Sequence, residues 1–128
     1  MQDLGVVAQR TILLVEDDFD LRSEIQRLLE EAGYRVVPAG NGADALLILR
    51  HSDPPDLILF DLMLPLVSGW DFSEEVSQDA KLSRIPRVVL SAIADRREAT
   101  VLRVPPENCV KKPFALEELL FLIRQLIP

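Results

Sequence analysis

Short apolar runs alternate along this chain with segments of helical periodicity. Four of the runs have no polar alternation within their apolar stretch, which is typical of strands in a parallel sheet that helices cover on both faces. The predicted strands are residues 12–15, 35–37, 57–60, 88–90 and, from a weaker run, 109–110. Five strands that alternate with helices predict an α/β fold with a doubly wound parallel sheet.

Helical patterns occupy the gaps between these runs. One apolar stripe over residues 21–32 predicts the first helix, and Gly33 is its expected carboxyl-terminal stop. The second helix is expected after Asn41, which can cap it, and the third after Ser68. A broad apolar face that follows Pro113 predicts the last helix.

The weakest helical pattern lies over residues 95–103. Val101 and Val104 are poor helix formers, and the pair Pro105 and Pro106 ends any helix at this point. We therefore expect the fourth helix to be short or irregular.

The length and charge of the chain limit its classes of function. Its 128 residues allow one well-buried core and no second domain of ordinary size. The formal net charge of -7 repels polyanions, so direct nucleic-acid binding is not expected. The single Cys109 cannot form an internal disulfide, and no apolar run reaches the roughly 18 residues of a membrane-spanning helix. We expect a cytoplasmic protein without membrane association.

Four charged residues stand where predicted strands end: Glu16, Asp17, Asp61 and Lys112. The carboxyl ends of parallel strands share one edge of the sheet, where open α/β folds bind ligands, so these side chains are expected to meet. Asp17 and Asp61 with a phosphate oxygen would suit Mg²⁺, and a carboxylate can accept a phosphoryl group as an acyl phosphate. Three negative charges and one lysine leave roughly two uncompensated negative charges, which one divalent cation would balance.

Ordinary structural roles compete with these interpretations. Asp17 could help to start a helix, and Asp18 is assigned mainly to that role, because acidic side chains are favourable at a helix amino terminus. Asp61 could be a turn residue, but a carboxylate that ends an apolar strand is costly without a partner. Lys111 is the nearest rival to Lys112, although strand alternation directs the two side chains to opposite sides.

The residues after the predicted strands resemble the receiver domains of two-component response regulators, the CheY-like fold. The motifs occur in order: an acidic pair, Asp61 followed by Pro65 and Gly69, a hydroxyl residue after the fourth strand, and a Lys-Pro pair after the fifth. The resemblance covers residues 10–128 and leaves residues 1–9 as an N-terminal extension. It implies a flavodoxin-like sheet with strand order 2-1-3-4-5.

The resemblance also implies roles for residues at the phosphoryl group. Asp61 would accept the group from a histidine kinase, a phosphotransfer protein or a small phosphodonor. Lys112 would pair with a phosphate oxygen. Ser91 would turn its hydroxyl toward the phosphoryl group, although a serine after a buried strand is often only a helix cap.

A Mg²⁺ site is implied by the same resemblance. Asp17 and Asp61 would bind the metal directly, Glu16 would bind it through water, and Met63 would bind it through the backbone carbonyl. Met63 and Ile93 stand where receivers often carry polar groups that admit or orient the hydrolytic water, and both are apolar here. We therefore expect slow autodephosphorylation.

Cys109 departs from the family pattern, because receivers usually carry a tyrosine or phenylalanine there that swings inward on activation. Pro105 and Pro106 add a second departure in the usual output face. We hypothesise that phosphorylation is normal while another surface carries the response. The apolar face of the last helix is one candidate for that surface, including as a contact in a homodimer.

Other classes of protein fit less well. Haloacid-dehalogenase-like phosphatases need a second aspartate two residues after the first as general acid, and Met63 cannot serve, so turnover of an external substrate is not expected. A histidine phosphotransfer module is a helical bundle, which the strand runs exclude. A pseudo-receiver, an interaction module that never takes phosphate, is the alternative. The downstream partner is open, as is the choice between a stand-alone regulator and a receiver from a longer protein.

Overall fold

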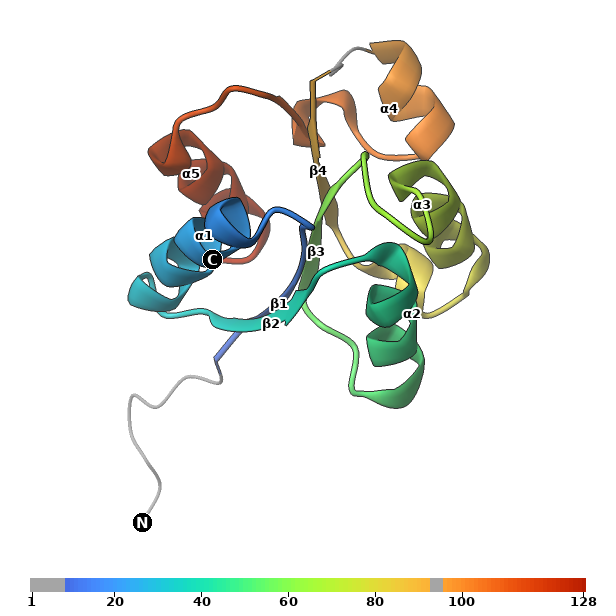
Figure 1. Cartoon of the computed structure of the whole chain (residues 1–128), viewed down its shortest axis with the longest axis horizontal. Helices are drawn as coiled ribbons and strands as arrows, with labels where there is room; N and C mark the ends of the chain where they lie inside the picture. Colours follow the sequence, from blue (N-terminus) through green and yellow to red (C-terminus); the bar gives the residue numbers. More distant parts are fainter. Residues whose placement is uncertain (1–8, 93–95) are drawn as a thin grey trace.

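The computed structural model describes residues 9–92 and 96–128 of the chain. Five parallel strands form one sheet in the order β2-β1-β3-β4-β5 (Figure 1). The strands are β1 (Thr11–Val15), β2 (Arg35–Ala39), β3 (Leu57–Asp61), β4 (Arg87–Ser91) and β5 (Cys109–Lys111). The expected α/β fold and its strand order are confirmed.

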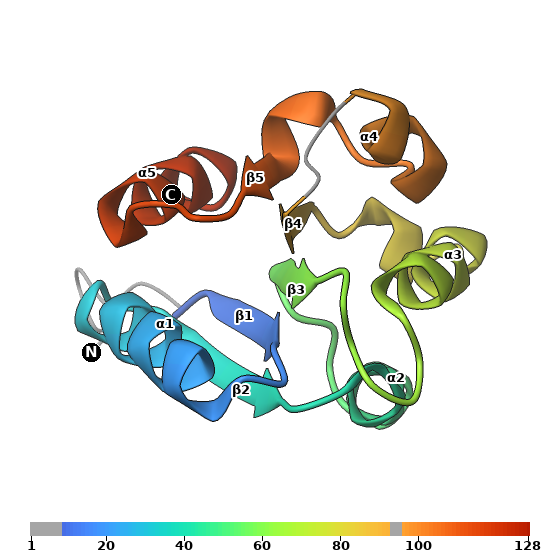
Figure 2. The same ribbon diagram turned by 45° about the horizontal axis from the view of Figure 1, so that its top comes forward.

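Helices cover both faces of the sheet. They are α1 (Phe19–Glu31), α2 (Gly42–His51), α3 (Gly69–Gln78), α4 (Arg96–Leu102) and α5 (Leu116–Leu126), with short 3-10 turns η1 (Leu82–Arg84) and η2 (Pro106–Asn108). The α1 and α5 helices pack on one face, and α2, α3 and α4 pack on the other (Figure 2). Along β1, Ile12 and Leu14 face the core under α1 and α5, and Leu13 and Val15 face the core under α2, α3 and α4. Both faces of the strand are therefore buried, which explains its unbroken apolar run.

The helix starts follow the expected caps. Asp18 Oδ1 accepts hydrogen bonds from the amides of Asp20 at 3.0 Å and Leu21 at 3.2 Å, which confirms Asp18 as the cap of α1. Asn41 Oδ1 accepts from the Asp44 amide at 2.7 Å, so Asn41 caps α2 as expected. Ser68 caps α3.

The fourth helix is short, as expected, with seven residues. The last helix packs most of its apolar stripe on the sheet, where Leu119 and Ile123 are fully buried. Phe121 is its one large hydrophobic side chain that is strongly exposed among the described residues. In the same described part of the chain, no helix is both long and apolar enough to cross a bilayer.

The strand register aligns the carboxyl ends that carry the candidate residues. Val15 pairs with Phe60 across β1 and β3, so Glu16 and Asp61 follow at the same level. Ser91 pairs with Lys111 across β4 and β5, and the Lys112 amide donates to the Ser91 carbonyl at 2.8 Å. Parallel pairing therefore brings the ends of four strands to one edge.

Candidate functional site

Three of the predicted site residues meet at this edge: Glu16, Asp61 and Lys112. The Lys112 ammonium donates a hydrogen bond to Asp61 Oδ2 and lies 3.6 Å from Glu16 Oε1. The two carboxylates are buried, whereas the lysine side chain is 31% exposed. One ammonium group is thus shared between two buried carboxyl groups, and the cluster has a net negative charge when both are ionised.

Asp61 is held in one orientation by contacts to both of its oxygens. Its Oδ1 accepts a hydrogen bond from the Met63 amide at 2.9 Å, and its Oδ2 accepts from Lys112. The Asp61 residue is only 3% exposed, so it is not an ordinary turn aspartate. A buried, oriented carboxylate at a sheet edge is suited to act as a nucleophile.

Glu16 carries the most perturbed carboxyl group of the site. Burial, and to a smaller extent the neighbouring Asp61, raise its pKa from 4.5 to about 7, even though the Asp18 amide and Lys112 act to lower it. Its Oε2 accepts from the Asp18 amide at 3.1 Å, while Oε1 has no hydrogen-bond partner among the described residues. An unsatisfied buried carboxylate oxygen beside a second carboxylate is a suitable donor for a cation.

The surroundings of Lys112 favour its charged form. Burial alone would lower its pKa, but the hydrogen bond to Asp61 and the charges of Asp61 and Glu16 raise it overall. The lysine therefore stays positively charged at neutral pH. Its rival Lys111 is exposed, and within the described ranges only Lys112 forms ion pairs with the two buried carboxylates.

The other predicted site residues lie at or just after the ends of β1, β3 and β4. Asp17 follows β1 and is exposed, and within residues 9–92 and 96–128 no three acidic, histidine or cysteine side chains form a metal-binding group. Ser91 is a buried residue at the end of β4, and α4 begins at Arg96, so Ser91 does not cap that helix. Met63 directs its amide at Asp61 and leaves its side chain 71% exposed. Ile93 lies outside the described residues.

Two supporting residues have roles that sequence patterns did not indicate. Arg22 Nη1 donates to the Glu16 backbone carbonyl at 2.7 Å and fixes the end of β1. Gly69 lets the loop after Asp61 return to β3, since a Cβ there would lie 2.5 Å from Leu62 Cα and 2.7 Å from the Asp61 carbonyl oxygen. The glycine of the motif is therefore a steric requirement of the loop beside the site.

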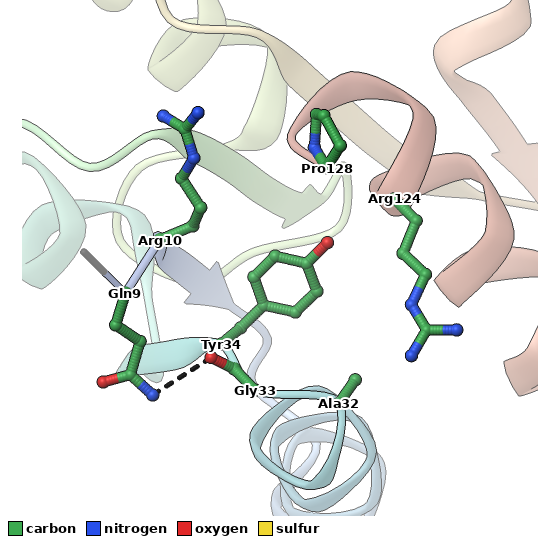
Figure 3. A pocket seen from close by; sticks show the side chains of 7 residues that line it. All are labelled: Gln9, Arg10, Ala32, Gly33, Tyr34, Arg124 and Pro128. Atoms are coloured by element: carbon green, nitrogen blue, oxygen red, sulfur yellow. Dashed lines mark hydrogen bonds between the residues drawn. The ribbon is translucent and has the colours of Figure 1, made fainter. Parts of the chain in front are cut away.

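A separate hollow of about 580 Å³ lies at the opposite edge of the sheet (Figure 3). Gln9 and Arg10, which precede β1, line it together with Tyr34, which precedes β2. Arg10 and Arg124 lie on either side of the Tyr34 ring. The hollow therefore lies at the amino ends of β1 and β2, whereas the Asp61 cluster lies at the carboxyl ends of the strands.

Known proteins resemble this chain over most of its length. The sequence profile of the response regulator receiver domain matches residues 12–124. A probable transcriptional regulator of Guillardia theta is 30% identical over 98% of this chain and 48% of its own length. The sensor histidine kinase TmoS of Ectopseudomonas mendocina is 36% identical over 93% of this chain and 12% of its own length. The chain thus spans about half of the first relative and a small part of the second.

A solved structure gives the same result for the fold. The receiver domain of a sensor histidine kinase from Pseudomonas aeruginosa aligns with a TM-score of 0.81 at 29% identity, covering 94% of this chain and 98% of that one. That structure is described with a magnesium ion coordinated in its active-site cleft.

Proposed function

The chain belongs to the response regulator receiver family, whose members act as phosphorylation switches in two-component signalling, and on this basis we propose that Asp61 is its phosphoryl acceptor. The observation that carries the proposal is the buried Asp61 carboxylate held by the Met63 amide and by Lys112. Receiver domains are signalling modules and do not turn over external substrates. The proposed reaction therefore changes the protein itself.

In the proposed step, an Asp61 oxygen attacks the phosphorus of a phosphohistidine or a small phosphodonor. A bond forms between that oxygen and phosphorus, the bond from phosphorus to the donor breaks, and the leaving group takes up a proton. Lys112, now paired with Asp61, would move its ammonium to a phosphoryl oxygen. Ser91 would then donate its hydroxyl to the phosphoryl group, and this change would alter the surface beside β4.

The residues fit a Mg²⁺ ion at this site. The unsatisfied Glu16 Oε1 and the excess negative charge are what a hard divalent cation compensates. Asp17 and Asp61 would bind it directly, Glu16 through water and Met63 through its carbonyl. When bound, the ion would neutralise charge on the phosphoryl oxygens.

We also propose the wider setting of this chemistry. A histidine kinase or phosphotransfer protein in the cytoplasm supplies the phosphoryl group, and the receiver unit spans residues 10–128. The response passes to a protein partner and not directly to nucleic acid, because the net charge of -7 opposes binding to polyanions. Self-association through α5 remains one form that the response could take.

Intact-protein mass after incubation with acetyl phosphate tests the proposal. We expect a gain of one phosphoryl group that requires Mg²⁺ and is absent from the Asp61→Asn variant. Asp53→Asn, which changes an exposed loop aspartate, is the matched control and should gain the group normally. No gain, together with no binding of beryllofluoride, would favour the pseudo-receiver alternative.

A further inference from the structure

The α2 and α3 helices lie side by side on one face of the sheet (Figure 1). A groove lies between them. Its larger part, about 420 Å³, is lined mainly by Leu46, Leu66, Val67, Asp71, Glu74 and Glu75. A smaller part of about 220 Å³ continues beyond Glu75 toward Leu82. The two parts share residues, so we treat them as one surface, the α2–α3 groove.

Leu66 at the rim of this groove has two unfavourable properties. Its backbone φ is 70°, in the left-handed region that leucine rarely adopts. Its side chain is also 81% exposed, the highest value among the large exposed hydrophobic residues that the structure describes. A glycine or asparagine would suit this turn better. Leucine instead presents an apolar group to solvent beside Leu46, where a partner could bury it.

The wall of the groove is acidic. Asp71, Glu74 and Glu75 line its larger part, and no lysine or arginine lines that part in the described structure. Asp71 and Glu74 form no ion pair with any described residue. At the far end Arg50 donates to Glu75 Oε2 at 3.1 Å, which shows how a guanidinium binds to this wall.

We propose that the α2–α3 groove binds a basic segment of a partner protein. An apolar side chain of that segment contacts Leu66 and Leu46, and flanking lysine or arginine residues pair with Asp71 and Glu74. Acidic walls repel nucleic acids and anionic lipid surfaces, so charge complementarity selects a basic polypeptide. This surface is separate from the Asp61 cluster and requires no phosphoryl group.

The test uses unphosphorylated, isotope-labelled protein without Mg²⁺ and a synthetic amphipathic peptide with leucine anchors and flanking lysines. We expect amide shifts confined to residues 42–51 and 66–79, and affinity that falls as salt rises. A companion peptide with glutamate in place of each lysine should not bind. Asp61→Asn should leave binding unchanged, which separates this proposal from the proposed phosphoryl chemistry.

Variants identify the contacts. Leu66→Asn keeps a residue suited to the left-handed turn, so the fold should persist in thermal melting while peptide affinity falls about tenfold. The double variant Asp71→Asn, Glu74→Gln should weaken binding by a similar factor. Its matched control, Glu117→Gln with Glu118→Gln, removes two exposed charges from α5 and should change affinity little. Equal weakening by the control pair, or shifts spread over all acidic surfaces, would overturn the proposal.

Discussion

The burial of Glu16 has a cost for the stability of the metal-free protein. It is 1% exposed, and burial raises its pKa to about 7 although its Oε2 accepts the Asp18 amide. Ionising it in the metal-free protein is therefore costly. A cation that bound the ionised group would recover that cost, so the same carboxylate destabilises the free protein and favours the bound one.

Glu16→Gln should therefore stabilise the metal-free protein at mildly alkaline pH. The pKa change from 4.5 to about 7 corresponds to about 3 kcal/mol at most, and the lost contact with Lys112 offsets part of it. Urea unfolding in the presence of a chelator measures the effect, with the exposed Glu31→Gln as control. Mg²⁺ should stabilise the parent more than this variant. A Glu16→Gln protein less stable than the parent under these conditions would contradict the interpretation.

The raised pKa of Glu16 also predicts the sign of a pH effect without metal. Between pH 4.5 and about 7, the folded protein retains a proton on Glu16 that the unfolded chain has lost. The free energy of unfolding, taken relative to Glu16→Gln, should be highest below the unfolded pKa and fall as pH rises toward the folded pKa. Denaturant titrations of both proteins across this range measure the difference. If the free energy of unfolding of the parent, taken relative to Glu16→Gln, instead rose with pH, the raised pKa of Glu16 would be refuted.

The lifetime of the proposed acyl phosphate is a second property that depends on single residues. Met63 exposes its apolar side chain beside Asp61, and such a group cannot orient a water molecule for hydrolysis. We predict that Met63→Asn with Ile93→Glu releases phosphate several-fold faster than the parent. Loss of the phosphorylated mass over time measures this, and Leu47→Asn, a distant exposed position, serves as control. Equal lifetimes would contradict the prediction.

At the scale of elements, Arg87 ties α3 and the end of α4 to β4. This residue is 7% exposed and donates to the Ser73 carbonyl, to the hydroxyls of Ser73 and Ser77, and to the Arg103 carbonyl. Burial, with the nearby Arg103, lowers its pKa. Ser73 in turn donates to the Leu102 carbonyl at 2.7 Å. Neutral acceptors on α3 and on Arg103, the residue that follows α4, thus hold a buried guanidinium.

Ser73→Ala should disrupt this connection. It removes an acceptor from Arg87 and a donor from the Leu102 carbonyl, so we expect a loss of about 1–3 kcal/mol in the free energy of unfolding. Chemical denaturation provides the measurement. The exposed Ser83→Ala, whose hydroxyl makes a weaker contact of 3.4 Å with the Ala80 carbonyl, should cost much less. Similar losses in the two variants would show that the buried network adds nothing.

The same elements show what sequence patterns can and cannot predict. Apolar runs predict the strands because each strand is covered on both faces, and cap residues predict helix starts because their hydrogen bonds are local. The apolar run predicts a strand over residues 88–90 and does not include Arg87, whose partners come from α3 and from Arg103. The pairing of Lys112 with Asp61 could be predicted from strand ends and family motifs. The contact of Arg22 with the Glu16 carbonyl could not, because it depends on the rotamer of a long side chain.

At the scale of the whole molecule, we infer that the edge that carries Asp61 and the surface that transmits the response are separate. Cys109 is half-buried and packs against the core on the α2–α3–α4 side, where the family usually has an aromatic switch. Trp70 of α3 donates to Glu98 of α4 at 2.8 Å, so α4 is also held from α3. Without an aromatic ring at position 109 to change its orientation, this part of the molecule lacks the usual moving group.

We therefore predict that beryllofluoride with Mg²⁺ shifts amide resonances around Asp61, Ser91 and Lys112 but leaves residues 99–109 largely unchanged. The physical reason is that a thiol is too small to exchange a buried for an exposed position in the way that a ring does. Amide spectra with and without the mimic make the comparison, and Asp61→Asn with the same additions controls for effects of salt. Installing the ring with Cys109→Tyr should extend the shifts into α4. Extensive shifts over residues 99–109 in the parent would show instead that the usual output face responds without the aromatic group.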